Sequence, residues 1–195
     1  MSLHEEILRG RRMLGPRGTV LKAADADPRR EGLVSELLKA LASQTDSSRN
    51  EIAPVLGEIG GEDVAAFLAD ALRSELSARN VDEDYQVYLA SALANIGGPD
   101  AVEQLLSAAE RGSKRVRLVA LSGLESLATA GSAALTEYPE PATIESPEMH
   151  EAYLRLAERL RALISASDTP SYVRYKAGEL LDTILISLSS VQFAF

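Results

Sequence analysis

The chain has 195 residues, of which 46% are hydrophobic, and a net charge of −9 at pH 7. It contains no cysteine, which excludes disulfides, thiolate metal sites and cysteine nucleophiles. No segment reaches the about 18 uncharged apolar residues of a membrane-spanning helix, and the first residues lack the apolar run of a signal peptide. These features predict a cytoplasmic protein with one domain and a continuous core, and no contact with a membrane.

The first segment differs in charge from the rest. Residues 1–30 hold seven Lys and Arg against four Asp and Glu, a net charge of +3, whereas residues 31–195 hold thirteen against twenty-five, a net charge of −12. Apolar spacing over residues 3–14 predicts a helix that Gly15 and Pro16 stop. We interpret residues 1–27 as a polar helical cap; the alternative is a basic arm for an anionic partner.

A turn sequence occurs twice in the middle of the chain. Ile-Gly-Gly-Glu-Asp-Val at residues 59–64 recurs as Ile-Gly-Gly-Pro-Asp-Ala at residues 96–101. Apolar residues precede both turns at positions i, i+3, i+4 and i+7, and the same frame fits two later segments. Such spacing places one apolar stripe on a helix, so it predicts four helices that each bury one face. The frame residues are Ile52, Val55, Leu56 and Ile59; Leu89, Ala92, Leu93 and Ile96; Ala120, Gly123, Leu124 and Leu127; Ala177, Leu180, Leu181 and Ile184.

An amphipathic segment precedes each of these four helices, so the repeating unit is a helical hairpin. Units of this size that recur at a regular interval indicate a solenoid, in which each unit buries its apolar face against its neighbours. The predicted fold is therefore an all-α solenoid of about four hairpins with an N-terminal helical cap, forming a single domain over residues 1–195. The repeats are expected at residues 28–61, 62–98, 99–130 and 149–187.

Residues 116–124 read Val-Arg-Leu-Val-Ala-Leu-Ser-Gly-Leu, close to the pattern Val-Arg-x-x-Ala-x-x-Ala-Leu. On this motif the chain resembles the HEAT-repeat family, in particular the short HEAT-like repeats first grouped with phycobiliprotein lyases, over about residues 30–186. The resemblance implies a HEAT-like α-solenoid. It also implies that the arginines at one repeat position, Arg49, Arg117 and Arg174, pack and pair along the stack; the alternative is a row of arginines that binds a ligand. The family commonly has an Asp–Arg ladder there, and Asp168 precedes Arg174 at the matching distance.

Three segments depart from the regular pattern. Pro54 falls inside the second helix of the first repeat and is expected to kink that helix or delay its start. Residues 82–84 are all acidic, which suits a helix start and does not form a metal site, because the side chains point in different directions. Residues 131–148 are acidic and rich in proline, and we interpret them as a solvated linker; the alternative is a contact loop.

Residues typical of catalysis are few. His4 and His150 are each followed by Glu, which is similar to the His-Glu pairs of the HEAT-repeat deoxyhypusine hydroxylases, but that family uses four pairs and this chain has two histidines. No catalytic residue, cofactor or metal site is predicted, although two His and two carboxylates could in principle hold iron or zinc. The acidic repeats also disfavour nucleic acid, because they repel its phosphates.

Recognition of a protein or peptide is the predicted function, as a non-catalytic scaffold or adaptor. The alternatives are an accessory subunit or enzyme of the phycobilin-lyase type and, third, a structural homo-oligomer. In HEAT-like stacks the second helices line the concave side, so their face opposite the buried stripe should bind the partner. The residues expected there are Asn50, Pro54, Asp84, Val87, Ser91, Arg115, Leu118, Ser122, Glu125, Tyr172, Tyr175, Glu179 and Asp182.

The last residues of the sequence form an apolar tail without a glycine stop. A terminal repeat is expected to turn a polar face outward, and this tail does not. Two interpretations remain open: the tail folds back over the last hairpin as a lid, or it forms a homodimer or a docking site. The apolar residues are Leu185, Ile186, Leu188, Val191, Phe193 and Phe195.

Overall fold

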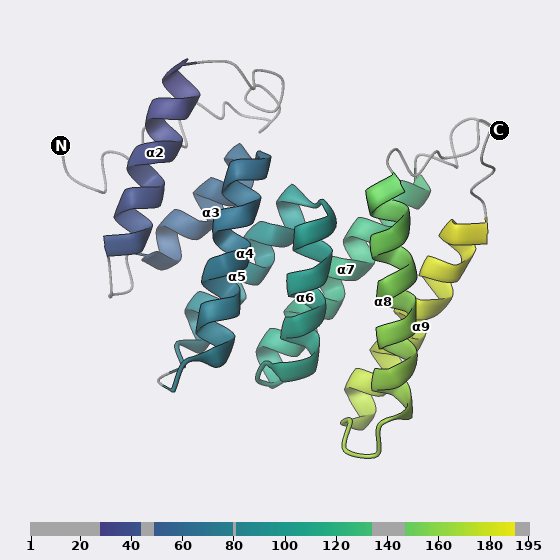
Figure 1. The fold of residues 1–195 in the computed structure, drawn as a ribbon. Coiled ribbons are helices and arrows are strands. Elements are labelled where there is room, and N and C mark those ends of the chain that lie inside the picture. Colours follow the sequence, from purple (N-terminus) through teal and green to yellow (C-terminus); the bar gives the residue numbers. More distant parts are fainter. Residues whose placement is uncertain (1–27, 44–48, 80, 134–146, 190–195) are drawn as a thin grey trace.

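The computed structural model describes residues 28–43, 49–79, 81–133 and 147–189. The expected N-terminal cap and the last residues of the tail therefore lie outside the described residues. The described part of the chain forms eight helices and no strand, which confirms the all-α prediction (Figure 1). The helices are α2 (Pro28–Ser43), α3 (Arg49–Ile59), α4 (Glu62–Ser77), α5 (Glu83–Ile96), α6 (Pro99–Arg111), α7 (Lys114–Ala133), α8 (Pro147–Ser165) and α9 (Ser171–Ser189).

The helices stack in two layers. The first helices of the hairpins, α2, α4, α6 and α8, lie in front in Figure 1, and the second helices, α3, α5, α7 and α9, lie behind them. Each second helix packs against its own first helix, and α3, α5 and α7 also pack against the second helix of the next hairpin. Four hairpins stacked in this way confirm the predicted HEAT-like α-solenoid.

The core lies between the two layers and follows the repeat frame. The frame residues of the second helices are buried except Ile96, Leu127 and Leu181, which are half-buried at the edges. From the first helices, leucines such as Leu37, Leu68, Leu105 and Leu160 are fully buried against them. Burying one such side chain stabilises the fold by about 2 kcal/mol, so the stripe accounts for the stacking of the hairpins.

Glycine pairs form the turns between the first three hairpins. Gly60, Gly61, Gly97 and Gly98 have φ values of 69°, 108°, 77° and 89°, a region that side chains rarely adopt. The N–H of Gly97 donates to the carbonyl of Leu93 at 2.9 Å and closes the end of α5. The recurring Gly-Gly sequence is therefore explained by the backbone conformation that the turn requires.

Small residues let neighbouring second helices approach closely. A Cβ atom placed on Gly57 of α3 would lie 2.7 Å from the Cα of Ala92 in α5. One placed on Gly123 of α7 would lie 2.8 Å from the Cβ of Ala94 in α5. Both glycines are thus required by packing, because any larger residue there would push the helices apart.

Two of the expected irregularities differ from the structure. The chain is already helical at Arg49, five residues before Pro54, so the expected delay of this helix is wrong. Ile52, Ala53, Val55 and Leu56 surround Pro54 and are all buried, and this burial offsets the backbone hydrogen bond that proline cannot make. Helices α7 and α8 also take up both ends of the expected insertion, and residues 134–146 between them lie outside the described residues.

Candidate binding face of the second helices

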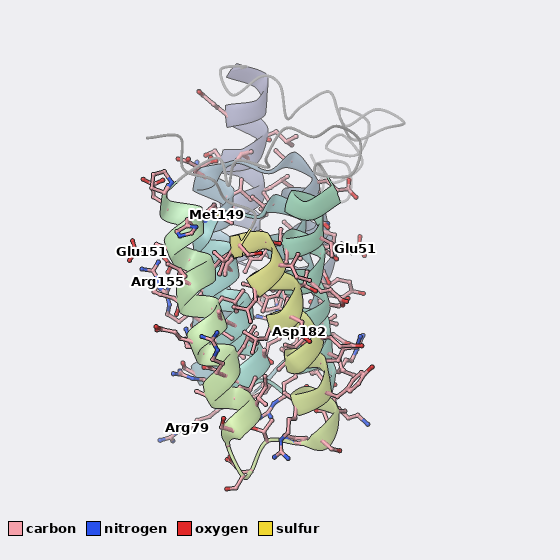
Figure 2. All side chains as sticks on the ribbon, turned by 90° about the vertical axis from the view of Figure 1, so that its right-hand side faces the viewer. Glu51, Arg79, Met149, Glu151, Arg155 and Asp182 are labelled. Carbon is pink, nitrogen blue, oxygen red and sulfur yellow. The ribbon has the colours of Figure 1, made fainter. Side chains whose placement is uncertain are left out.

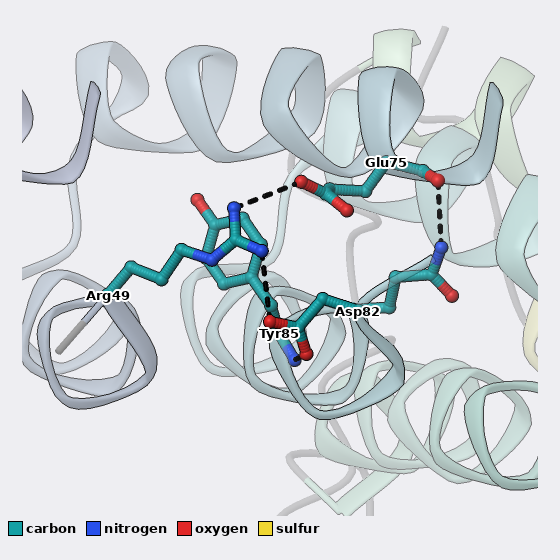
Figure 3. A network of polar contacts seen from close by, with 5 residues as sticks. Arg49, Glu75, Asp82 and Tyr85 are labelled. Carbon is teal, nitrogen blue, oxygen red and sulfur yellow. Dashed lines mark hydrogen bonds and ion pairs between the residues drawn. The ribbon is translucent and has the colours of Figure 1, made fainter. Parts of the chain in front are cut away.

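Arg49, at the start of α3, connects the first hairpin to the second (Figure 3). Its Nη1 donates to Glu75 Oε1 at 3.2 Å, at the end of α4, and its Nη2 donates to Asp82 Oδ2 at 2.9 Å. The guanidinium carbon also lies 4.1 Å from the ring centre of Tyr85. Asp82 in turn caps α5, because its Oδ1 accepts the backbone N–H of Tyr85 at 3.0 Å.

The charges of this cluster stabilise one another. The backbone N–H of Tyr85 and then the Arg49 guanidinium lower the pKa of Asp82. Burial lowers the pKa of Arg49, but the hydrogen bond to Asp82 and the charges of Glu75 and Asp82 outweigh it, so the pKa is raised. Burial raises the pKa of Tyr85 to about 12, so its phenol stays neutral. The cluster is therefore a structural ion pair between two hairpins.

In the other three hairpins, the residue at the repeat position of Arg49 has a different hydrogen-bond partner. Gln86 Nε2 donates to the carbonyl of Glu75 at 2.9 Å, Arg117 Nε to that of Gly112 at 2.7 Å, and Arg174 Nη2 to that of Ala166 at 3.1 Å. Each of these side chains thus holds the end of the first helix in its own hairpin.

The expected pairing of Asp168 with Arg174 is therefore wrong. Arg174 donates to the carbonyl oxygens of Ala166 and Thr169 instead, because the turn after α8 presents these carbonyls to it. At this repeat position, an arginine-to-aspartate connection between repeats occurs instead at Arg49 and Asp82.

Polar contacts continue along the starting ends of the second helices. Asp84 of α5 pairs with Arg115 of α7, and Ser113 Oγ donates to Glu83. Lys114 Nζ lies 5.4 Å from the ring centre of Tyr172 in α9. The structure thus brings three expected site residues, Asp84, Arg115 and Tyr172, to one edge of this layer.

Exposed apolar side chains lie on three successive second helices. Leu118 of α7 is 39% exposed and Tyr175 of α9 is 65% exposed. On α5 the expectation was wrong: Val87 is only 9% exposed and belongs to the core cluster, whereas its neighbour Tyr88 is 37% exposed. The neighbouring helices of a stack cover the flanks of each second helix, and the periodicity of one helix does not show how far this cover extends. Tyr88 was missed for the same reason.

The remaining expected residues surround these three with polar groups. Glu179 accepts hydrogen bonds from Lys176 Nζ at 2.8 Å and from Tyr175 Oη at 2.6 Å, which together lower its pKa. Arg115 is exposed and lies three residues before Leu118 on α7. Asp84, Ser122 and Asp182 are exposed, while Asn50, Pro54, Ser91, Glu125 and Tyr172 are half-buried. We use the name second-helix face for Tyr88, Leu118 and Tyr175 with these polar neighbours.

The first-helix layer is different in character. Arg159 of α8 forms ion pairs with Glu110 at 2.6 Å and with Glu103 at 2.5 Å, both from α6, and these charges raise its pKa. Leu154, which is 47% exposed, stands among charged neighbours on α8. Arg159 thus connects the third and fourth hairpins through charged groups of this layer.

The described residues offer little catalytic chemistry. Among them, no three His, Asp or Glu side chains gather as a metal site would require, and His150 is half-buried on α8, while His4 lies outside them. A hollow of about 560 Å³ lies between the starts of α4 and α6, but Glu62 and Asp100 line it and would repel an anion. None of the helices described is both long and apolar enough to cross a bilayer.

These features define a helical-repeat protein of the HEAT-like type. Residues 86–111 match the family model of the PBS lyase HEAT-like repeat, which confirms the resemblance stated from the sequence. The matched stretch covers most of α5 and all of α6, and its buried residues are packing residues of the stack. No curated protein has a sequence that matches this chain.

Proposed function

We propose that this protein is a non-catalytic binding module that receives a protein or peptide segment along the second-helix face. The observation that supports this proposal is the exposure of Tyr88, Leu118 and Tyr175 on three consecutive second helices. They come from adjacent positions of the repeat, so a partner lying across α5, α7 and α9 can contact all three.

The composition of this face favours a protein partner over a phosphate chain. Tyrosine is enriched among residues that dominate protein interfaces, because it contributes a large apolar area and a hydroxyl at low entropic cost. Acidic and basic side chains alternate around it, as in the pairs of Asp84 with Arg115 and of Glu179 with Lys176. Such a rim provides polar specificity without the continuous basic surface that nucleic acid requires.

The test compares two leucines that are similarly exposed on opposite layers. Leu118→Glu should remove most of the binding of a partner, by about 1–3 kcal/mol, because it places a charge in the centre of the face. Leu154→Glu on α8 is the matched control and should leave binding unchanged. Both variants should keep the helical signal and stability of the natural chain, within about 0.5 kcal/mol, because both sites are exposed.

The measurement is a quantitative pull-down with the natural chain and both variants as baits, followed by titration of the recovered protein. A partner that is lost with Leu118→Glu and kept with Leu154→Glu supports the face. A partner lost with Leu154→Glu alone, or kept by both variants, would show that binding takes place elsewhere.

A second candidate follows from the family match, because the PBS lyase HEAT-like repeat carries a lyase in its description. The protein would then be an accessory subunit or enzyme that handles a tetrapyrrole chromophore. Visible absorbance that co-purifies with the native protein, or appears when a bilin is added and survives gel filtration, would favour this candidate over the binding module.

A further inference from the structure

One side of the last helix of the stack, α9, is not covered by any other described helix. Figure 2 views the molecule from this end, and α8 and α9 lie nearest to the viewer, with Asp182 on α9. We define the α9 edge as Arg174, Tyr175, Gly178, Leu181, Asp182 and Leu185, which lie within about 60° of Gly178 around the helix at about 100° per residue. Each of these six residues is exposed or half-buried.

In the earlier hairpins the positions that match Gly178 and Leu185 are buried. Ala53, Ala90 and Leu121 occupy the repeat position of Gly178, and all three are buried. Ala128 stands at the position of Leu185 and is buried too. The α9 edge is therefore an inter-hairpin surface without a following hairpin in the described chain.

Gly178 stands in the middle of this edge, and nothing among the described residues explains why a glycine is there. A Cβ atom placed on Gly178 would meet no atom within 4 Å, in contrast to Gly57 and Gly123, where the neighbouring helix leaves no space. Glycine weakens a helix relative to alanine, so a glycine here costs stability without a packing reason in the described part of the chain. A close approach by another helix would provide that reason.

The edge is complementary to itself about Gly178. Arg174 and Asp182 lie four residues before and after Gly178, and Tyr175 and Leu181 lie three residues before and after it. If two α9 helices cross antiparallel with a two-fold axis at Gly178, each Arg174 lies at the height of the partner's Asp182. Tyr175 and Leu181 lie on opposite sides of this contact and flank it. Opposite charges are thus paired by the symmetry operation.

We propose that a second copy of this chain docks on the α9 edge, as an antiparallel α9–α9 pair with the two glycines at the centre. The proposal does not depend on the binding face, although Tyr175 borders both surfaces. A pair of helices of this length is small compared with the about 1,600 Å² of a standard interface, so the dimer should form at about 10–100 μM protein.

The experiment measures molar mass by light scattering on the natural 195-residue chain from 1 to 200 μM. A concentration-dependent rise from monomer to dimer is expected, and Gly178→Gln should abolish it, because glutamine favours the helix but prevents close approach. Glu158→Arg, an exposed change on α8, is the control and should leave the dimer intact. A natural chain that stays monomeric at 200 μM, or a dimer that Gly178→Gln leaves unchanged, would overturn the proposal.

Charge exchange tests the pairing itself. Asp182→Arg alone gives Arg facing Arg, and Arg174→Asp alone gives Asp facing Asp, so each variant should be monomeric. Mixed in equal amounts, the two variants should form a heterodimer, because both pairs then have opposite charges. Two variants that both keep the helical signal and fail to associate when mixed would contradict the two-fold arrangement.

Residues 190–195 are the competing occupant of this edge, since they follow α9 directly and include Val191, Phe193 and Phe195. A chain that ends at Ser189 separates the two possibilities. If the second copy covers the edge, the shortened chain still dimerises and remains sensitive to Gly178→Gln. If only the shortened chain dimerises, residues 190–195 cover the edge in the natural chain, and the proposal fails.

Discussion

Arg49 holds three elements together with one side chain. The Nη1 and Nη2 atoms of its guanidinium donate to Glu75 at the end of α4 and to Asp82 at the start of α5, and the guanidinium lies over the ring of Tyr85. A planar, bidentate donor is needed for this, so lysine would not replace it. Side chains of Arg49 and Glu75 are only 16% and 17% exposed, and partial burial makes this pair stronger than a surface ion pair.

A pH-dependent loss of stability is expected from Asp82. Its pKa in the folded protein is below the ordinary value of 3.8, so its charge stabilises the fold above about pH 4. This contribution is lost as the pH falls through the lowered pKa. Asp82→Asn still caps α5 but cannot pair with Arg49, and it should cost about 0.5–1 kcal/mol at pH 7.

Thermal unfolding of both proteins between pH 7 and pH 2.5 provides the measurement. The difference in melting temperature should be largest near neutral pH and shrink toward pH 2.5. Asp70→Asn, in the exposed pair with Arg73, is the control and should change little at any pH. A difference for Asp82→Asn that stays constant over this range would show that its charge does not contribute.

The contacts and exposure of single side chains were the features least predictable from the sequence. The partners of Arg49 lie 26 and 33 residues away along the chain, and no local pattern links them. Val87 and Tyr88 show the same limit, because both lie near the flank of one helix and only the stacked neighbours decide which is covered. Leu118 and Tyr175 were placed on the exposed side correctly, since their positions are far from the buried stripe.

At the scale of helices, small residues set how closely the second helices pack. Gly57 meets Ala92 between α3 and α5, and Ala94 meets Gly123 between α5 and α7, at matching positions of the repeat. The corresponding residues for α7 and α9 are Glu125 and Leu180, so this pair of helices cannot repeat the same close contact.

Two glycines on the second helices should respond to alanine in opposite ways. Gly57→Ala places a Cβ against the backbone of Ala92 and should destabilise the fold by about 1–3 kcal/mol. Gly178→Ala meets open space and should stabilise the monomer by about 0.5–1 kcal/mol. Urea unfolding at 1 μM protein, where the proposed dimer is absent, measures both. Equal effects at the two sites would show that the α3–α5 contact is looser than described.

The helices themselves followed well from the sequence. The period of the apolar residues and the repeated Gly-Gly turn located the hairpins, because both depend on local geometry. The effect of Pro54 was misjudged, since the cost of proline in a helix is local, whereas the burial that offsets it comes mainly from α5 and α2. The polar connections between hairpins also depend on stacking and could not be derived.

At the scale of the molecule, each hairpin is stabilised mainly by its neighbours. Helix α5 packs against α3, α4, α6 and α7, whereas α2 packs against α3 and only slightly against α4. We therefore expect amide hydrogen exchange, followed by mass spectrometry, to be slowest in α5 and fastest in α2 among the described helices. Equal protection of α2 and α5 would mean that the stack opens as one cooperative unit.

Because the same Gly-Gly turn precedes and follows the second hairpin, that hairpin could be deleted without loss of a turn. Deleting residues 61–97 would join Gly60 to Gly98. The new junction would again be a Gly-Gly turn, and both of its glycines already have positive φ values. Gly57 would then lie opposite Gly123, with room to spare. Arg49 would be left without Glu75 and Asp82, and Arg115 at the start of α7 would be left without Asp84. The backbone of this protein thus permits a change in the number of hairpins, and the two arginines without partners oppose it.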